Sequence, residues 1–275
     1  MKYCAKFCKG LNLERFEEIS IIYERQAQEL VSFIQEHKEQ RVILVIKFDE
    51  IKHFYQSQEW KLINAIHGEY PDINLSVCLE DISSFHMVDE VEKEIAQKLE
   101  VPVFFGMCAT NFDQLQYLLS LNVSDVYLTE EICFDLKRAK KLCSNYGVTI
   151  RAFPNIAQSG VRETPALHKF FIRPEDIQEY GKYIDVLEFW GPIDRQEVLQ
   201  RIYSKERWFG DLKEIILDLN IAFDSRRILP VFGEIRSTCK RKCMAGEDCT
   251  MCDKILSIAE KLEDKGIIIK RNSKH

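Results

Sequence analysis

The 275-residue sequence predicts an α/β fold. The expected architecture is a TIM-barrel-like repeat of βα units, complete or modified, with a helical, cysteine-rich C-terminal extension. From about residue 40, short apolar runs rich in β-branched residues alternate with amphipathic helical windows. The runs start roughly every 20–30 residues, which is the spacing of βα units in a parallel sheet. This rhythm stops after Trp190, and four cysteines lie within residues 239–252.

Seven apolar runs have the length and composition of strands in one sheet. They are Val42–Phe48, Asn74–Leu79, Val101–Gly106, Asp125–Thr129, Val148–Phe153, Lys169–Arg173 and Asp185–Trp190. Either Lys2–Phe7 or Gly266–Lys270 supplies an eighth strand, and eight βα units predict a barrel. The alternative is an open doubly wound sheet, but the sequence contains neither GxGxxG nor GxxxxGK[ST].

Helical windows separate these runs. They lie around Glu59–His67, Val88–Leu99, Phe112–Leu121 and Phe134–Tyr146, and a further helix starts at Pro174. After the last strand the pattern predicts three more helices, Arg195–Tyr203, Asp211–Leu219 and Lys254–Lys265. We therefore expect a barrel-like domain over residues 1–191. Residues 192–275 form a helical, four-cysteine extension packed on the same domain.

Composition excludes several classes of protein. The formal net charge of −6 argues against broad binding to nucleic-acid phosphates. No run approaches the roughly 18 apolar residues of a membrane span, so no membrane association is expected. The N-terminal residues have no apolar core followed by a cleavage site. The ten cysteines are therefore expected to be reduced thiols of a cytoplasmic protein, some of them metal ligands.

Polar residues follow or interrupt the predicted strands at their C-terminal ends, where barrel enzymes place their chemistry. Glu188 and Arg151 lie inside apolar strands and are our candidate catalytic residues, because a charge there needs a partner or a function. A buried Arg–Glu pair is the structural alternative. Candidate ligand-binding residues at other strand ends and in the loop after Phe153 are Asn155, Gln158, Arg173, Glu80 and Glu130. Such residues can equally cap helices or satisfy loop backbone.

The most specific motif is C-x3-C-x5-C-x2-C, formed by Cys239, Cys243, Cys249 and Cys252. Four thiolates this close in sequence can converge on one centre, and sulfur favours zinc or iron–sulfur over calcium or magnesium. The sequence predicts one tetrathiolate site holding either a [4Fe–4S] cluster or Zn²⁺. Cys4 and Cys8 have the same C-x3-C spacing near the N-terminus, and no role is assigned to them. The histidines are scattered, with no HExxH, which argues against a histidine-ligated zinc hydrolase.

Two sequence segments and the cysteine group resemble one known family over about residues 100–255. SDVYLTEEICFDLKRAKKLCSNYGVTIRAF and FFIRPEDIQEYGKYIDVLEF, followed by the cysteines, look like the collagenase-like peptidase family. That family includes iron–sulfur proteins of RNA and ubiquinone hydroxylation. The resemblance implies a barrel-like fold, a four-cysteine [4Fe–4S] site, and a role in oxygen insertion or RNA modification rather than proteolysis.

Two functions are therefore expected. The first is a modification or hydroxylation enzyme acting on RNA or a small aromatic substrate, with an iron–sulfur centre for electron transfer. The second is a non-catalytic assembly or interaction protein with a structural zinc site. In the second case, residues 194–219 would form the surface for a protein partner. Trp190, Trp208 and Phe209 are either anchors of that surface or buried core residues.

Overall fold

The computed structural model describes most of the barrel and parts of the C-terminal region. The described residues are 1–7, 11–23, 27–69, 73–83, 85–129, 132–157, 170–192, 195–204, 208, 212–217, 219, 221–222, 232–239 and 270–271. Within these residues, no helix combines the length and apolar character needed to cross a membrane.

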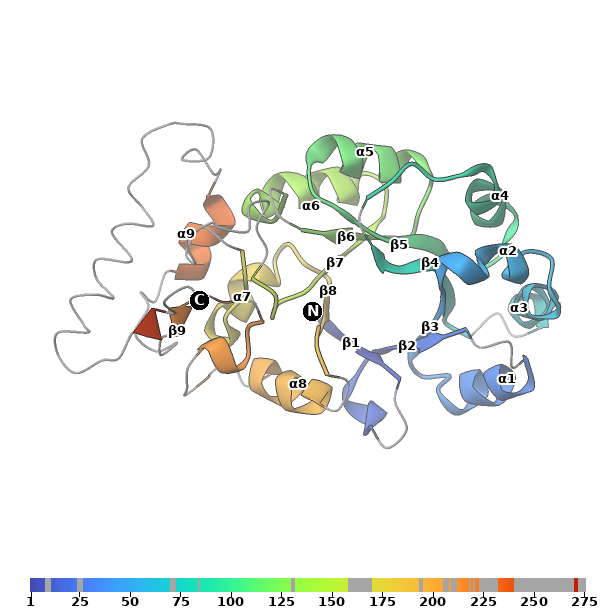
Figure 1. Ribbon diagram of the computed structural model, residues 1–275, viewed down its shortest axis with the longest axis horizontal. Coiled ribbons are helices and arrows are strands. Elements are labelled where there is room, and N and C mark those ends of the chain that lie inside the picture. The colour runs from blue at the N-terminus through green and yellow to red at the C-terminus, as the bar shows by residue number, and fades with distance from the viewer. Residues whose placement is uncertain are drawn as a thin grey trace.

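Eight parallel strands form a closed barrel in sequence order, because β1 pairs with β8 as well as with β2 (Figure 1). This confirms the predicted fold class. The strands are β1 (Lys2–Lys6), β2 (Glu18–Ile22), β3 (Arg41–Ile46), β4 (Leu75–Ser83), β5 (Val103–Ala109), β6 (Asp125–Leu128), β7 (Thr149–Ala152) and β8 (Val186–Glu188). Runs such as RVILVI in β3 suit this position, since strands of a parallel barrel are buried on both faces.

Helices follow the strands and surround the barrel (Figure 1). They are α1 (Ala27–Glu36), α2 (Ile51–Phe54), α3 (Gln58–Glu69), α4 (Glu90–Lys98), α5 (Phe112–Ser120), α6 (Leu136–Ser144), α7 (Ile177–Tyr180) and α8 (Gln196–Ser204). Side-chain caps begin three of them: Asp89 caps α4, Asn111 caps α5 and Asp135 caps α6. Between β1 and β2, the described part of the connection holds only the 3₁₀ turn Leu13–Arg15.

Two strand predictions need correction. The second barrel strand is Glu18–Ile22, which the sequence analysis passed over because this short run begins with a charged residue. The prediction of a strand at Lys169–Arg173 is wrong, since residues 170–173 contribute no strand to the barrel. This segment is apolar because Phe170 and Phe171 are buried against neighbouring aromatic rings. A short apolar run does not distinguish a strand from a buried connection.

The C-terminal region contains short elements beside the barrel. β9 (Ile221–Ala222) pairs antiparallel with β10 (Lys270–Arg271), so the described end of Gly266–Lys270 belongs to this small sheet and not to the barrel. Within Asp211–Leu219, where a helix was predicted, the described residues form only the 3₁₀ turn Leu212–Glu214. The predicted helix Lys254–Lys265 lies outside the described residues. Helix α9 (Phe232–Thr238) contacts α6 and α7 (Figure 1).

Helix α8 lies beyond the predicted domain boundary at residue 191. It packs against the end of β1 and the connection that follows this strand. The Gln196 side chain accepts from the Lys6 backbone N–H at 2.8 Å and donates to the Lys6 carbonyl at 3.1 Å. One turn later, the Gln200 amide donates to the Arg15 carbonyl at 3.3 Å. These contacts make α8 the helix of the eighth βα unit. The face of α8 that bears Gln196 and Gln200 is therefore used within the chain.

Candidate functional site

Buried charged side chains form a network between strands of the barrel, a fold whose interior is usually filled by branched apolar side chains. Arg151, in the middle of β7, is fully buried and donates hydrogen bonds to Glu18 on β2 and, at 2.9 Å, to Asp125 on β6. Arg41, at the start of β3, places its two terminal nitrogens 2.7 and 2.6 Å from the two Asp125 oxygens. Its Nε donates to Ser76 Oγ at 2.9 Å.

The positions of these residues in their strands place the network at the N-terminal end of the barrel. Glu18, Arg41 and Asp125 are the first residues of β2, β3 and β6, and these strands all run in the same direction. In barrels this end supports stability, whereas catalytic residues come from the opposite end. Burial alone would raise the pKa of Asp125, but Arg151 and Arg41 together lower it below its ordinary value.

Glu188, the second candidate catalytic residue, is buried at the end of β8. Its Oε2 accepts a 2.7 Å hydrogen bond from the Tyr127 hydroxyl and lies 3.7 Å from the nearest Arg151 nitrogen. Burial raises the pKa of Glu188, against the opposing effects of Arg151 and the Tyr127 hydroxyl. Besides Glu188, the network has two carboxylates, those of Glu18 and Asp125, facing the guanidinium groups of Arg41 and Arg151. The Lys2 ammonium group also lies 3.9 Å from Glu18 Oε1.

Two candidate ligand-binding residues, Asn155 and Arg173, make structural contacts in the segments that follow β7. The Asn155 amide donates to the Trp190 carbonyl at 2.7 Å and accepts from the Trp190 N–H at 2.9 Å, which ties the loop after β7 to the loop after β8. Arg173 is buried and binds both Asp176 oxygens, at 2.6 and 2.7 Å. Both side chains therefore have structural partners in this arrangement.

A third candidate, Glu80, belongs to a cluster that the sequence analysis did not foresee. The cluster contains Glu80 from β4, His86 from the following loop and Glu92 from the first turn of α4. His86 Nε2 lies 3.0 Å from Glu80 Oε1 and 3.7 Å from Glu92 Oε1. The three candidate ligand atoms all lie within 4.8 Å of one another.

The backbone around Glu80 is unusual. Its φ of 72° lies in the left-handed region, which is rare for a residue with a side chain. The pairing of β4 with β5 also changes register between Leu79 and Ser83. Such irregularities re-aim side chains at strand ends and occur often beside active sites. Here the irregularity accompanies a buried Glu80 carboxylate that reaches the His86 ring.

Glu92 has two roles, one for each carboxylate oxygen. Its Oε2 accepts a 2.6 Å hydrogen bond from the Asp89 backbone N–H, and the Asp89 side chain accepts from the Glu92 N–H at 2.9 Å. This reciprocal pair is a capping box that starts α4. The second oxygen, Oε1, is buried and has no hydrogen-bond partner in the described part of the chain. It points towards His86.

Only one of the four predicted metal-binding cysteines can be placed. Cys239 is a half-buried thiol that directly follows α9, and it packs against the hydrophobic core. Five predicted site residues lie outside the described residues and remain predictions: Glu130, Gln158, Cys243, Cys249 and Cys252. All six cysteines within the described residues are thiols, and the five besides Cys239 are buried.

Helix α9 holds Cys239 against the C-terminal rim of the barrel. The guanidinium group of buried Arg236 lies over the ring of Phe134, which follows β6, with its carbon 4.7 Å from the ring centroid. Arg173, at the start of the helical segment that follows β7, lies over Phe232 at the same distance. At Gly233, an added Cβ would come within 2.6 Å of Asp176 Cβ, so the helix backbone approaches this segment closely.

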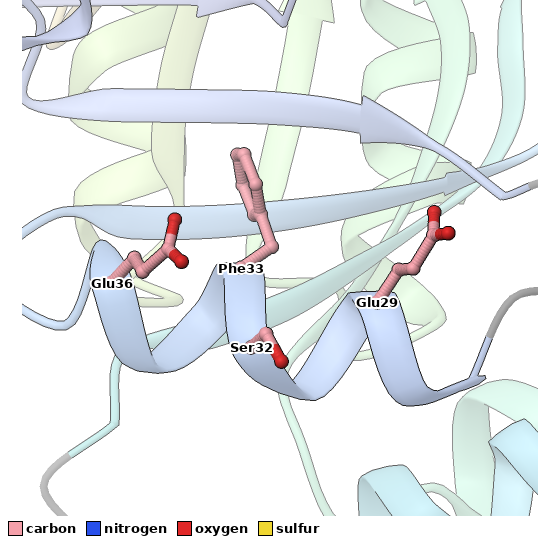
Figure 2. Close-up of a pocket in the computed structure, with 4 residues that line it drawn as sticks. All are labelled: Glu29, Ser32, Phe33 and Glu36. Atoms are coloured by element: carbon pink, nitrogen blue, oxygen red, sulfur yellow. The ribbon is translucent and has the colours of Figure 1, made fainter.

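A shallow surface depression of about 290 Å³ lies along α1 and is unrelated to the predicted site (Figure 2). Its lining consists of side chains on one side of this helix: Glu29, Ser32, Phe33 and Glu36. Three of the four are exposed. No residue of this depression belongs to the barrel interior or to the Glu80 cluster, and we assign no function to it.

His86 and Glu92 are the residues of this region that sequence reasoning missed. His86 was set aside as one of several scattered histidines. Glu92 carried a readable signal, because Asp89-x-x-Glu92 is the sequence pattern of a capping box. That pattern predicts the start of α4 but says nothing about the second carboxylate oxygen. The three residues come from a strand, a loop and a helix, so no regular spacing could show that they converge.

The fold and the placement of these residues define a TIM-barrel-like α/β protein with polar groups at both ends of the barrel. The chain matches no protein-family model. It also matches no curated protein.

Proposed function

We propose that the protein is a barrel enzyme with a metal centre bound by Cys239, Cys243, Cys249 and Cys252. The centre is a [4Fe–4S] cluster or Zn²⁺, with iron–sulfur slightly favoured. As an iron–sulfur protein it would carry out a modification or hydroxylation of RNA or of a small aromatic molecule. This proposal includes a cytoplasmic location, since thiolate ligands persist in a reducing compartment, and membership of the collagenase-like peptidase family.

The observation that carries the proposal is the place where the cysteine segment starts. Because the ligands of one tetrathiolate site converge, the proposed centre would lie close to Cys239. Cys239 follows α9, which packs against the segments after β6 and β7. Those segments belong to the C-terminal face, where barrel enzymes place their chemistry. A centre held there would be adjacent to a substrate bound over the strand ends.

The donor set fits the proposed groups. Four thiolates suit both Zn²⁺ and a [4Fe–4S] cluster, and Cys239 is a thiol held on a helix that is anchored to the barrel. A bound iron–sulfur cluster would supply one-electron transfer. The chain's own residues would anchor the centre, through Arg236 and Gly233 on α9, and would keep the strand ends in place through Asn155 and Arg173.

The alternative function is a non-catalytic assembly protein with structural zinc. It is supported by the buried, fully engaged state of several residues that were expected to line a pocket. Asn155 and Arg173 already have partners in the chain. In this case Zn²⁺ would stabilise a segment too small for its own core, and the part of α8 that faces away from the barrel would bind a partner.

Metal analysis of anaerobically purified full-length protein separates these functions. Brown protein that contains iron and acid-labile sulfide supports the enzyme, whereas colourless protein with one zinc ion per chain supports the structural alternative. Cys249→Ser should lower the metal content in either case. Cys143→Ser, which removes a buried thiol from α6, is the matched control and should retain the metal. If the purified protein contains neither metal, and Cys249→Ser has wild-type stability, the metal proposal is wrong.

A further inference from the structure

A second candidate metal site, which is independent of the cysteines, lies at the C-terminal end of β4. Glu80, His86 and Glu92 bring one imidazole nitrogen and two carboxylate oxygens together. We propose that these three side chains bind a divalent transition-metal ion. Imidazole together with carboxylates suits Zn²⁺, Mn²⁺ and related ions, whereas magnesium and calcium prefer oxygen ligands alone.

The distances suit such an ion. A tetrahedral ion with bonds of about 2.0–2.1 Å separates its ligand atoms by roughly 3.3 Å. The two separations from His86 Nε2, 3.0 Å to Glu80 and 3.7 Å to Glu92, lie on either side of this value. The three atoms already lie within 4.8 Å of one another, and a bound ion would draw them towards the tetrahedral separation.

The buried oxygen of Glu92 points to a ligand. Glu92 is only 1% exposed, and its Oε1 has no hydrogen-bond partner among the described residues. A buried carboxylate oxygen without a partner is costly, because it has lost its contacts with water. The other oxygen is fixed by the Asp89 N–H, so the side chain cannot turn away without breaking the helix cap. A bound cation would satisfy the second oxygen in place.

An ion pair between Glu80 and His86 is the simpler explanation of the cluster, but it does not account for the second carboxylate. With that pair formed, Glu92 Oε1 is still buried without a hydrogen-bond partner among the described residues. Glu92 Oε1 also lies 3.7 Å from the imidazole nitrogen, which is too long for a hydrogen bond. A divalent ion would give this oxygen a partner and would also bind the Glu80 oxygen and the imidazole nitrogen.

The site would have an open coordination position. It has three protein ligands, as catalytic zinc sites do, whereas structural sites have four. The His86 side chain is 37% exposed, so solvent can reach the ion. Phe48, which is 67% exposed, lies edge-on to the His86 ring with the two ring centroids 6.2 Å apart. A water molecule or an oxygen of a substrate would occupy the open position, beside this exposed aromatic ring.

Equilibrium binding of Mn²⁺ to the full-length protein tests the site, because Mn²⁺ prefers imidazole and carboxylate ligands to thiolates. We expect one Mn²⁺ per chain, counted by the loss of the free-ion paramagnetic resonance signal. Glu92→Gln and His86→Ala should each weaken binding by at least about 100-fold, since a ligand contributes more than the outer-shell groups worth about 10–100-fold. Glu92→Gln suits this test because glutamine can also complete a capping box.

Two controls separate this site from the cysteine centre. Glu90→Gln removes an exposed carboxylate from the same turn of α4 and should bind Mn²⁺ as the wild type does. Cys249→Ser should disturb the cysteine centre and leave Mn²⁺ binding unchanged. With Zn²⁺ as the probe, Glu92→Gln should bind one ion fewer per chain than Glu90→Gln.

The proposal is overturned if Glu92→Gln and Glu90→Gln bind equal amounts of both ions while both variants remain folded. It is also overturned if Cys249→Ser abolishes Mn²⁺ binding. Thermal unfolding of each variant shows whether it is folded. Failure of the cysteine centre to bind metal would leave this result unaffected, because the two sites share no residue.

Discussion

The buried carboxylates at the two ends of the barrel differ in their partners. At the N-terminal end, Glu18 and Asp125 face two guanidinium groups, those of Arg41 and Arg151, at hydrogen-bonding distance. At the C-terminal end of β4, two buried carboxylates share a single imidazole, and one of their oxygens has no hydrogen-bond partner within the described residues. In the first group both carboxylates are hydrogen-bonded to guanidinium groups, whereas in the second the Glu92 Oε1 atom is the buried oxygen without such a partner.

This difference shows why a buried charge is not by itself a sign of function. Arg151 and Glu188 looked functional because they interrupt apolar strands, yet Arg151 is bound by carboxylates and Glu188 by a tyrosine hydroxyl. A network whose charges balance inside the protein serves the fold, although it can cost as much as it contributes. A cluster that holds a buried carboxylate oxygen without a hydrogen-bond partner, as Glu92 Oε1 is among the described residues, is the better candidate for a binding site.

The largest effect is expected from breaking the balanced network. Arg151→Met removes the cation that Glu18 and Asp125 share and leaves Arg41 and the partly exposed Lys2 as their remaining ion-pair partners among the described residues. Removing one partner of a buried ion pair costs about 3–5 kcal/mol. Denaturant unfolding should therefore show a loss of this size in the free energy of unfolding. Arg201→Ala, which breaks the exposed pair with Glu197 on α8, is the control and should cost about 0.5 kcal/mol or less. Equal losses in the two variants would contradict a structural role for the network.

A smaller effect is expected in the pH dependence of stability, where Asp125 and Glu188 act in opposite directions. The pKa of Asp125 is lowered, mainly by Arg151 against the effect of burial. Its contribution is therefore present above its ordinary value of 3.8 and is lost as the pH falls through the folded value. Burial raises the pKa of Glu188 above 4.5, so its contribution is full below pH 4.5 and is lost as the pH rises through the folded value.

Glu188→Gln separates these two contributions. The amide cannot ionise, so the variant should lose less stability than the wild type as the pH rises above about 4.5. The loss of stability at acidic pH, which protonation of Asp125 produces, should remain. Free energies of unfolding measured from about pH 3 to pH 8 on both proteins test this expectation. Parallel curves above pH 4.5 would show that Glu188 has no raised pKa.

The backbone at Glu80 predicts an inverted ranking of glycine and alanine. A left-handed φ costs a residue with a side chain about 1–2 kcal/mol, and glycine avoids this cost. Glu80→Gly should therefore be more stable than Glu80→Ala by about 1 kcal/mol, although both variants lose the carboxylate. At Ser76, in the regular part of β4, the same pair of substitutions should favour alanine. If alanine is the more stable residue at both positions, the left-handed conformation at Glu80 is not present in solution.

The smallest effect is expected at Glu92, and its sign is the opposite of that for the balanced network. In metal-free buffer, Glu92→Gln removes one of two carboxylates whose oxygens lie within 4.8 Å of each other. Relief of this repulsion should raise the free energy of unfolding by about 0.5 kcal/mol. Glu18→Gln makes the same change in the balanced network and should lower the free energy of unfolding. A loss at both positions would show that the Glu92 carboxylate is already compensated within the chain.

The sequence predicted most of the barrel because strands and helices leave local signals, namely short apolar runs and helical periodicity. A run such as Val42–Ile46 is apolar on both faces, and windows such as Phe112–Leu121 have helical periodicity. Glu18–Ile22 escaped notice because its first side chain is charged and faces the barrel interior. Lys169–Arg173 was mistaken for a strand because burial of Phe170 and Phe171 makes any connecting segment apolar.

The sequence by itself determined the fold class and the one cysteine motif, because both depend on spacing along the chain. Only the tertiary structure decided which charges are balanced. Arg151 meets Glu18 across 133 positions of sequence, and no local pattern encodes that contact. Glu80, His86 and Glu92 lie within one short stretch, yet they meet because β4 is irregular at its end and the next helix begins with a capping box. Local chemistry set the elements, and barrel closure set the partners of each charge.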